Sequence, residues 1–245
     1  MSNPYYAPGE QRAAKVNDLF TAIARRYDLL NDLQSFGLHR CWKRRVAELA
    51  VVQSGCCALD LCCGTGDIAF ALARRGAMVT GLDFSGKMLE MAEIRSEKSG
   101  PKTGTRNPTF IQGDAQQIPF PDATFDAVTI GYGLRNLASW EGGLAEMRRV
   151  AKPGARLVVL DFGKPANTLW RRIYFGHLRV SVPLIGWLFC GKADAYAYIL
   201  ESLNHYPAQS GVAEKMRELK LVNVRVIHLL GGAMAINYGE KPPDP

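Results

Sequence analysis

Four aspartates stand at or beside the ends of short apolar runs, and glycines separate two of them. Asp60 falls in the first run, which leads into Gly64-Thr-Gly66, and Asp67 opens the helical pattern that follows. Asp83 ends the second run, and Asp114 follows the third. Because the carboxyl ends of parallel strands meet at one edge of a sheet, we expect these carboxylates around one crevice.

The glycine loop allows close approach of the backbone to a ligand at a helix N-terminus. Asp67 in the first helical turn would repel a pyrophosphate but not a cationic ligand, and Asp83 is placed to bind both hydroxyls of a ribose. S-Adenosylmethionine carries a sulfonium, an α-ammonium and a ribose. We therefore predict S-adenosylmethionine as the cofactor, bound around Asp60, Gly64, Gly66, Asp83 and Asp114. Taken singly, each of these acids is also a common helix cap or turn residue.

Length and composition narrow the class of protein. The chain has 245 residues, of which 47% are hydrophobic and 22% charged, and this excludes a disordered chain. Its net charge of +7 is spread in short clusters, which suits either a polyanionic partner or solvated helix faces. No apolar run is long enough to span a membrane, and the N-terminus lacks the pattern of a secretory signal. We expect a soluble protein of the cytoplasm.

Six cysteines include two adjacent pairs, Cys56-Cys57 and Cys62-Cys63. Zinc ligands are usually separated by two to four residues, so we predict no metal site and interpret residues 56–63 as a buried strand with free thiols.

Apolar runs and helical stretches alternate along most of the chain. The runs lie near residues 56–63, 78–84, 109–112, 125–131, 156–162, 223–229 and 233–240, and helical patterns near 10–26, 39–52, 67–75, 86–98 and 139–151. This alternation predicts an α/β, Rossmann-like fold with a seven-stranded, mostly parallel sheet. Gly231-Gly232 between the last two runs predicts a C-terminal antiparallel hairpin strand. We assign residues 1–52 to an N-terminal helical cap and 53–245 to the main domain, with a helical insertion over about 165–205.

Four motifs resemble known methyltransferases, and three of them resemble one family. Leu59-Asp-Leu-Cys-Cys-Gly-Thr-Gly-Asp67 is similar to motif I of class I methyltransferases, and Tyr27-Asp-Leu-Leu-Asn-Asp-Leu-Gln-Ser-Phe-Gly-Leu-His-Arg-Cys-Trp42 resembles the N-terminal signature of the quinone-biosynthesis C-methyltransferases. Residues 149–165 resemble their second signature, and Ile130-Gly-Tyr-Gly-Leu-Arg-Asn136 their element after the fourth strand. The resemblance covers residues 15–241. Cys62-Cys63 and Ala155 stand where the family usually has small residues or glycine.

The resemblance implies transfer of a methyl group from S-adenosylmethionine to a ring carbon of a prenylated quinol. The C-terminal residues 231–240 favour a demethylnaphthoquinol such as demethylmenaquinol, and a benzoquinol of ubiquinone biosynthesis is the alternative. The implied cofactor contacts are Thr65, Asp83, Asp114 with Ala115, and Gly131.

A ring carbon becomes a good nucleophile only when an adjacent hydroxyl shares its proton with a base or polarising group. The polar residues of the family elements that could meet this need are Tyr27, Asp28, Asn31, His39, Arg135 and Asn136. Arg135 stays protonated, so it would stabilise a phenolate or order a water. His39 titrates in the right range, and its alternative role is packing or capping.

The aromatic and basic segment Trp170–Phe189 has two interpretations: a buried helix pair, or an apolar lid that covers a polyprenyl tail. In the second, Arg171, Arg172 and Arg179 would lie at lipid headgroups, giving peripheral contact with the inner face of a membrane. We expect a lipophilic quinol as partner and no nucleic acid, and the sequence leaves a homodimer open.

Three other functions remain to be tested. A nicotinamide-dependent oxidoreductase is suggested only by Gly64-x-Gly66-x-x-Ala69, which fits the relaxed dinucleotide fingerprint. A nucleic-acid methyltransferase would suit the basic charge, but the amino-methylating type needs an Asn-Pro-Pro-Tyr-like tetrad where residues 131–136 read Gly-Tyr-Gly-Leu-Arg-Asn. A non-catalytic binding module would leave the cofactor and ring-side residues without a role.

Overall fold

The computed structural model describes residues 27–99, 106–190, 202–203 and 205–243. The side chains of Tyr27, Leu30, Ser99 and residues 182–190 also lie outside this description. The helix predicted over residues 10–26 therefore falls outside the described residues.

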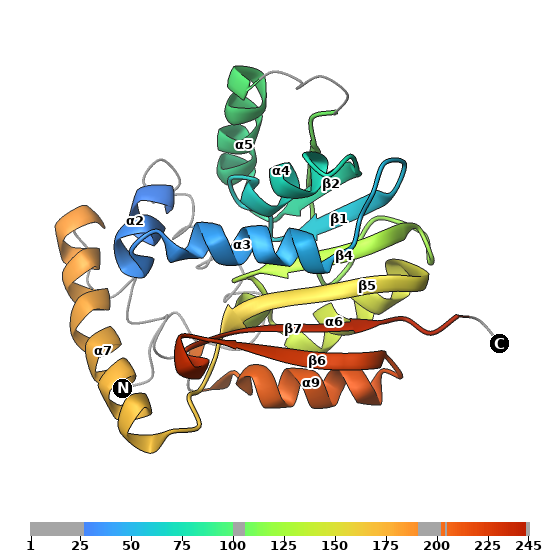
Figure 1. Ribbon diagram of the computed structural model, residues 1–245. Coiled ribbons are helices and arrows are strands. Elements are labelled where there is room, and N and C mark those ends of the chain that lie inside the picture. Colours follow the sequence, from blue (N-terminus) through green and yellow to red (C-terminus); the bar gives the residue numbers. More distant parts are fainter. Residues whose placement is uncertain (1–26, 100–105, 191–201, 204, 244–245) are drawn as a thin grey trace.

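One seven-stranded sheet runs through the molecule (Figure 1). Its strands follow the order β3-β2-β1-β4-β5-β7-β6. Their bounds are β1 Cys57–Leu61, β2 Met78–Asp83, β3 Thr109–Gln112, β4 Phe125–Gly131, β5 Ala151–Phe162, β6 Val222–Leu229 and β7 Met234–Glu240. The first five strands are parallel, and β7 runs antiparallel to both β5 and β6. The predicted mixed sheet with an antiparallel final hairpin is confirmed.

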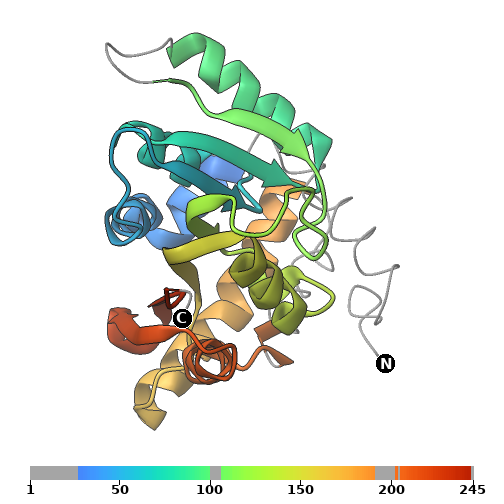
Figure 2. The ribbon, with the colours of Figure 1, turned by 90° about the vertical axis from the view of Figure 1, so that its right-hand side faces the viewer.

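Helices cover both faces of the sheet. Their bounds are α2 Tyr27–Ser35, α3 Leu38–Leu49, α4 Asp67–Ala73, α5 Gly86–Ser99, α6 Trp140–Val150, α7 Thr168–Cys190 and α9 Ala208–Glu218. Helices α3 and α4 share one buried cluster with β1 and β2, whereas α6 and α9 share another with β4 and β5. Figure 2, viewed nearly along the strands, shows α3 (blue) on one side of the sheet and α6 (yellow-green) on the other.

The sequence explains these two layers. The central strands are almost fully buried on both faces and carry continuous apolar runs, as parallel strands covered by helices do. Helix α3 contributes Val46, Ala47 and Leu49 to the core, so it is part of the sandwich that covers the sheet. The domain boundary after residue 52 stays a prediction.

Two elements differ from the predicted ranges. β5 begins at Ala151, five residues before the apolar run, because the segment continues to pair with β4 across an irregularity between Phe125 and Ala127. Helix α2 occupies a segment in which no helix was predicted. It ends at Ser35, and the next two residues, Phe36 and Gly37, have left-handed backbone (φ +50° and +74°) that turns the chain into α3.

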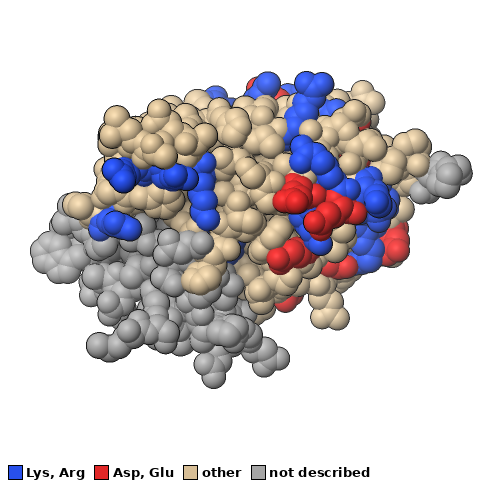
Figure 3. Space-filling model, turned by 90° about the horizontal axis from the view of Figure 1, so that it is seen from below, with Lys and Arg blue, Asp and Glu red and all other residues tan. Residues whose placement is uncertain are grey.

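Helices α2 and α7 lie beyond the carboxyl ends of the parallel strands, at the left of Figure 1. α7 exposes Leu169, Ile173 and Val180 by 67%, 53% and 70%, at spacings of four and seven residues that place them on one helical face. Arg172 and Arg179 are also exposed. Seen from below, one group of Lys and Arg side chains lies at the left, the side of α7 in Figure 1, and a second group lies at the right beside Asp and Glu side chains (Figure 3). None of the described helices is long and apolar enough to cross a bilayer.

Candidate functional site

A pocket of about 780 Å³, partly open to solvent, lies at the carboxyl ends of β1, β2 and β4. Asp83 and Asp114 contribute carboxylates to its wall, and Leu82, Met88 and Leu137 contribute apolar surface. Two strands and their following loops supply the acids, as expected from the sheet edge where parallel strands end. The 780 Å³ counts all of the empty space, including open solvent at the mouth of the pocket.

Asp83, the last residue of β2, fixes the shape of this pocket. Its Oδ2 accepts a hydrogen bond from the Gly64 amide at 2.8 Å, and its Oδ1 accepts one from the Ser85 amide at 2.9 Å. Burial raises the pKa of Asp83, and these backbone hydrogen bonds offset part of that rise. One carboxylate therefore joins the glycine loop to the end of β2 while it faces the pocket.

The glycine loop has left-handed backbone at Cys62, Gly64 and Gly66, with φ of +50°, +56° and +85°. A Cβ at Gly66 would lie 2.9 Å from the ring of Phe70, so glycine is required there by both backbone and space. Cys62 and Gly64 line the pocket, whereas Thr65 and Gly66 are not among the described residues that line it.

Three other predicted cofactor residues surround the pocket. Asp114, Ala115 and Gly131 all line it. A Cβ at Gly131 would lie 2.6 Å from Cδ1 of Ile68, so the end of β4 packs directly against α4. These positions come from two loops that are distant in sequence.

Asp60 lies beneath the loop and is not among the described pocket-lining residues. Its side chain is buried, and the Thr129 hydroxyl donates to its Oδ1 at 2.8 Å. Oδ2 forms no hydrogen bond of normal geometry with any described residue. Burial raises the pKa of Asp60 to about 7, although Thr129, Lys43 and the Ala69 backbone offset part of the rise. Oδ2 of Asp60, just before the glycine loop in sequence, is thus a buried acceptor that no described residue satisfies.

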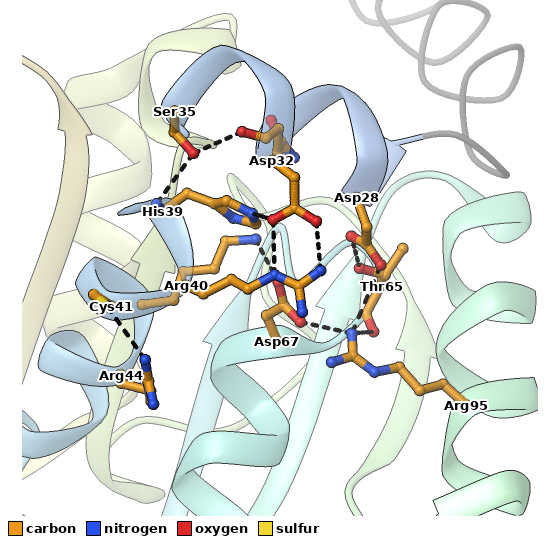
Figure 4. Close-up of polar contacts among 12 residues, drawn as sticks. Asp28, Asp32, Ser35, His39, Arg40, Cys41, Arg44, Thr65, Asp67 and Arg95 are labelled. Carbon is orange, nitrogen blue, oxygen red and sulfur yellow. Dashed lines mark hydrogen bonds and ion pairs between the residues drawn. The ribbon is translucent and has the colours of Figure 1, made fainter. Parts of the chain in front are cut away.

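Asp67 does not have the role that the sequence suggested. Its Oδ2 binds the Lys43 ammonium at 2.8 Å and its Oδ1 the Arg95 guanidinium at 2.6 Å (Figure 4). Burial alone would raise the pKa of Asp67, but these two cations outweigh it and hold the pKa well below its usual range. Since its charge is neutralised and it is absent from the described pocket wall, the expected repulsion of a pyrophosphate by Asp67 was wrong.

Arg135 follows β4 and is buried beside the end of β5. Its Nη1 donates to Asp161 Oδ1 at 2.8 Å and to the Tyr132 carbonyl at 2.7 Å, and its guanidinium lies 4.6 Å from the Phe162 ring centroid. The Arg135 amide also donates to Asp161 Oδ2 at 3.2 Å. The cation is therefore held at a fixed position by Asp161. Arg135 is not among the described residues that line the pocket, whereas its neighbour Asn136 is.

Sequence reasoning missed Asp161, although a signal was present. It ends the apolar run over residues 156–162, just as Asp83 ends its own run. The same rule about acids at the carboxyl ends of strands would have selected it. Its side chain is 3% exposed, and its pairing with Arg135 was not visible because 26 residues separate them.

The other predicted catalytic residues lie in different places. Asn136 lines the pocket and donates from Nδ2 to the Tyr132 carbonyl at 3.2 Å. Tyr27 begins α2, but its side chain lies outside the described residues.

His39 is buried on α3, where its Nε2 lies 2.9 Å from Asp32 Oδ1 (Figure 4). Arg40 binds the same carboxylate through two nitrogens, at 2.7 and 2.6 Å. Burial, followed by the charge of Lys43, lowers the pKa of His39. His39 is not among the described pocket-lining residues, so this geometry favours its packing role.

Comparison with known proteins gives consistent matches over nearly the whole chain. A sequence profile of the ubiE/COQ5 methyltransferase family matches residues 9–241. The chain is 38% identical over 237 residues to a demethylmenaquinone methyltransferase of Desulfitobacterium hafniense, covering 96% of this chain and 92% of that protein. It is 39% identical over 238 residues to the ubiquinone/menaquinone biosynthesis C-methyltransferase UbiE of Azotobacter vinelandii, covering 96% and 93%.

Solved structures agree on the fold. A SAM-dependent methyltransferase of Thermotoga maritima, described as a possible histamine N-methyltransferase, superposes with a TM-score of 0.65 at 16% identity, over 92% of this chain and 99% of that one. A putative methyltransferase of Haloferax volcanii, solved with the Trm112 activator, gives a TM-score of 0.64 at 18% identity, over 94% and 99%. The fold is that of class I methyltransferases, and the extent and identity of the sequence matches show that this chain belongs to the ubiE/COQ5 methyltransferase family.

Proposed function

We propose that this protein transfers a methyl group from S-adenosylmethionine to a ring carbon of a prenylated quinol. The observation that carries the proposal is a buried, immobilised Arg135 beside a pocket with two carboxylates, in a member of this methyltransferase family. The acceptor favoured here is a demethylnaphthoquinol such as demethylmenaquinol, because a relative at 38% identity is a demethylmenaquinone methyltransferase. A polyprenyl benzoquinol is the second candidate, because the relative at 39% identity is named for both quinone pathways.

The residues present fit S-adenosylmethionine. Asp83 and Asp114 provide acceptors for ribose hydroxyls and polar groups, and Met88, Ala115 and Leu137 provide an apolar wall for a base. Asp60 adds a buried carboxylate oxygen that needs a partner, which suits water or a cationic group above it. Gly64, Thr65, Gly66 and Gly131 form the surrounding backbone in this proposal.

The bound cofactor supplies an electrophilic methyl group on sulfur. The protein must then raise the electron density of the acceptor ring. Arg135 would order a water that takes the proton of a quinol hydroxyl, and it would stabilise the phenolate that remains, because a guanidinium stays protonated throughout. Asp161 fixes the position of Arg135 and prevents it from swinging into solvent. Asn136 and Tyr27 would orient the ring oxygen, and His39 is the least favoured base because of its buried contact with Asp32.

Competing assays test the acceptor. Labelled S-adenosylmethionine is supplied with paired demethylnaphthoquinols and benzoquinols, each in reduced and oxidised form. We expect transfer to the reduced naphthalene ring. Transfer to an oxidised ring would contradict the requirement for a nucleophilic quinol. Faster transfer to the benzoquinol would show that the second candidate acceptor is the preferred one. Separate calorimetric titrations with S-adenosylmethionine and NAD test the oxidoreductase alternative.

A prenylated quinol resides in a membrane, so we propose that this enzyme contacts the inner face of a membrane from the cytoplasm. On α7, Leu169, Ile173 and Val180 form an exposed apolar face that Arg172 and Arg179 accompany. Exposed apolar side chains bordered by cations suit the interface of an anionic bilayer. A second exposed apolar surface is formed by Leu29 and Leu33 of α2 and by Phe36 just after it, which are 50%, 47% and 86% exposed.

Vesicle binding tests this contact. Arg172→Glu with Arg179→Glu should reduce sedimentation with vesicles that contain phosphatidylglycerol, and salt should weaken binding of the unchanged protein. Lys215→Glu on α9 is the control, because it changes the same type of charge on another helix. Equal binding of all three proteins would refute the α7 contact. A homodimer stays a prediction, which sedimentation velocity can test.

A further inference from the structure

Helices α2, α3 and α5 all contact the short segment Thr65–Asp67 (Figure 4). Lys43 of α3 and Arg95 of α5 bind opposite oxygens of Asp67. Arg95 also donates to the Thr65 carbonyl at 3.3 Å, and its guanidinium lies 5.2 Å from the Phe70 ring centroid. The glycine loop thus takes part of its support from helices outside the strand and helix that it joins.

Asp28 of α2 provides the contact that carries a functional consequence. The Thr65 hydroxyl donates to Asp28 Oδ1 at 2.8 Å. Thr65 is 4% exposed, whereas the side chain of Asp28 is 38% exposed. Asp28 does not line the described part of the pocket. Its Oδ2 also lies 3.9 Å from Nη1 of Arg95. The Asp28 carboxylate therefore acts on the pocket through Thr65 and through Arg95, which both belong to or bind the loop segment Thr65–Asp67.

The direction of this hydrogen bond determines the polarity of Thr65. A hydroxyl has one proton to donate and two lone pairs that accept. Because Asp28 takes the proton, the Thr65 oxygen can offer only lone pairs to any other group. Thr65 is buried and is not among the described residues that line the pocket, so this hydrogen bond acts on a bound ligand through the position of the glycine loop.

The same helix makes a second, independent contact that serves as an internal comparison. Asp32, four residues after Asp28, binds Arg40 and His39 of α3. The side-chain hydrogen bond from Arg40, followed by that from His39, lowers the pKa of Asp32 to about 2. Asp32 therefore joins α2 to α3, whereas Asp28 joins α2 to the glycine loop.

We propose that Asp28 is a positioning residue for the cofactor: it holds Thr65 as a hydrogen-bond acceptor and couples α2 to the affinity of the glycine loop for a cationic nucleoside. This rests on the proposed function, because it takes the loop to be the S-adenosylmethionine loop. Asp28 is assigned a role in ligand affinity through Thr65, in place of its earlier candidacy as a group that acts on the quinol ring.

Three substitutions on α2 test the proposal, with calorimetric affinity for sinefungin, a cationic analogue of S-adenosylmethionine, as the readout. Asp28→Ala removes the acceptor and should raise the Kd about five- to tenfold, the effect of one lost hydrogen bond. Asp28→Asn keeps an acceptor oxygen at the same position and should stay within about twofold of the unchanged protein. Asp32→Ala loosens α2 from α3 but leaves the loop contact, so its Kd should also stay within about twofold.

Thermal unfolding of each variant confirms that it is folded before titration. An unchanged Kd for Asp28→Ala would overturn the proposal, and an equal loss in Asp28→Asn would show that the acceptor oxygen is not the cause. An equal loss in Asp32→Ala would show that α2 acts only by general packing. If the unchanged protein does not bind sinefungin, the proposed function itself fails, and this result is distinct from the other three.

Discussion

The cofactor side and the acceptor side of this protein are built differently. On the cofactor side, Asp83 and the glycine loop are joined by backbone hydrogen bonds within about 20 residues of sequence. On the acceptor side, Arg135 depends on Asp161, and α2 and α7 are separated in sequence by all five parallel strands. A local motif can therefore specify the first side almost completely, whereas the second exists only after long-range packing.

Removing Arg135 should give the largest effect and should separate the two sides. Arg135→Ala is expected to lower kcat about a hundred- to a thousandfold, because a fixed cation near a developing phenolate is lost. Sinefungin affinity should change less than about twofold. Asp161→Asn should give a smaller loss of kcat, since it weakens the hold on Arg135 but keeps the cation. A large loss of sinefungin affinity in Arg135→Ala would mean that the two sides are not separate.

Asp83→Ala is the reciprocal test on the cofactor side. It removes the acceptor of two backbone amides, so we expect the Kd for sinefungin to rise about a hundredfold. Asp126→Ala is the matched control. Asp126 also accepts a backbone hydrogen bond, from Cys57, but it is the second residue of β4 and is not among the described residues that line the pocket. Calorimetry of both variants measures the difference. Similar losses in the two would show that Asp83 acts through stability alone.

Gly133, after β4, packs closely against Cys62, after β1, and this packing between the acceptor side and the cofactor side can be tested. A Cβ at Gly133 would lie 2.4 Å from the Cβ of Cys62, so Gly133→Ala should lower the free energy of unfolding by about 1–3 kcal/mol. Combining it with Cys62→Gly should recover most of that loss, because the overlapping atoms are gone. Gly176→Ala on α7 has no atom within 4 Å of the added carbon and is the control. Chemical denaturation of the four variants gives the coupling energy, and strict additivity would contradict the contact.

Asp60 should produce an effect that is visible only as a dependence of stability on pH. Its pKa is raised from 3.8 to about 7 in the folded protein, so the unfolded chain binds fewer protons between these values. Its contribution to the free energy of unfolding should therefore fall as pH rises from about 4 to 7 and level off above 7. Asp60→Asn should remove this fall, which is at most about 4 kcal/mol over the whole interval. Melting curves at pH 4 to 8 measure it, and an unchanged dependence on pH would assign it to other groups.

The chemistry of the pocket was largely predictable. The prediction that Asp83 and Asp114 lie together rested on a general rule, that parallel strands end at a common edge, and both residues do line one pocket. Ala115, which the family resemblance implied, lines the same pocket. The same rule would have selected Asp161. It failed for Asp67, because a position in the first turn of a helix does not reveal that Lys43 and Arg95 come from two other helices to neutralise it.

The order of the seven strands along the chain, the antiparallel final strand and the glycine loop could be predicted from local periodicity and backbone conformation, whereas α2 could not. Which charges are neutralised depends on contacts between distant segments. Asp67 is paired, Asp60 has an oxygen with no hydrogen bond to a described residue, and Asp28 reaches Thr65 from 37 residues away. The energy of a carboxylate depends on its neighbours and its burial, and both are set by contacts between segments that the sequence places far apart.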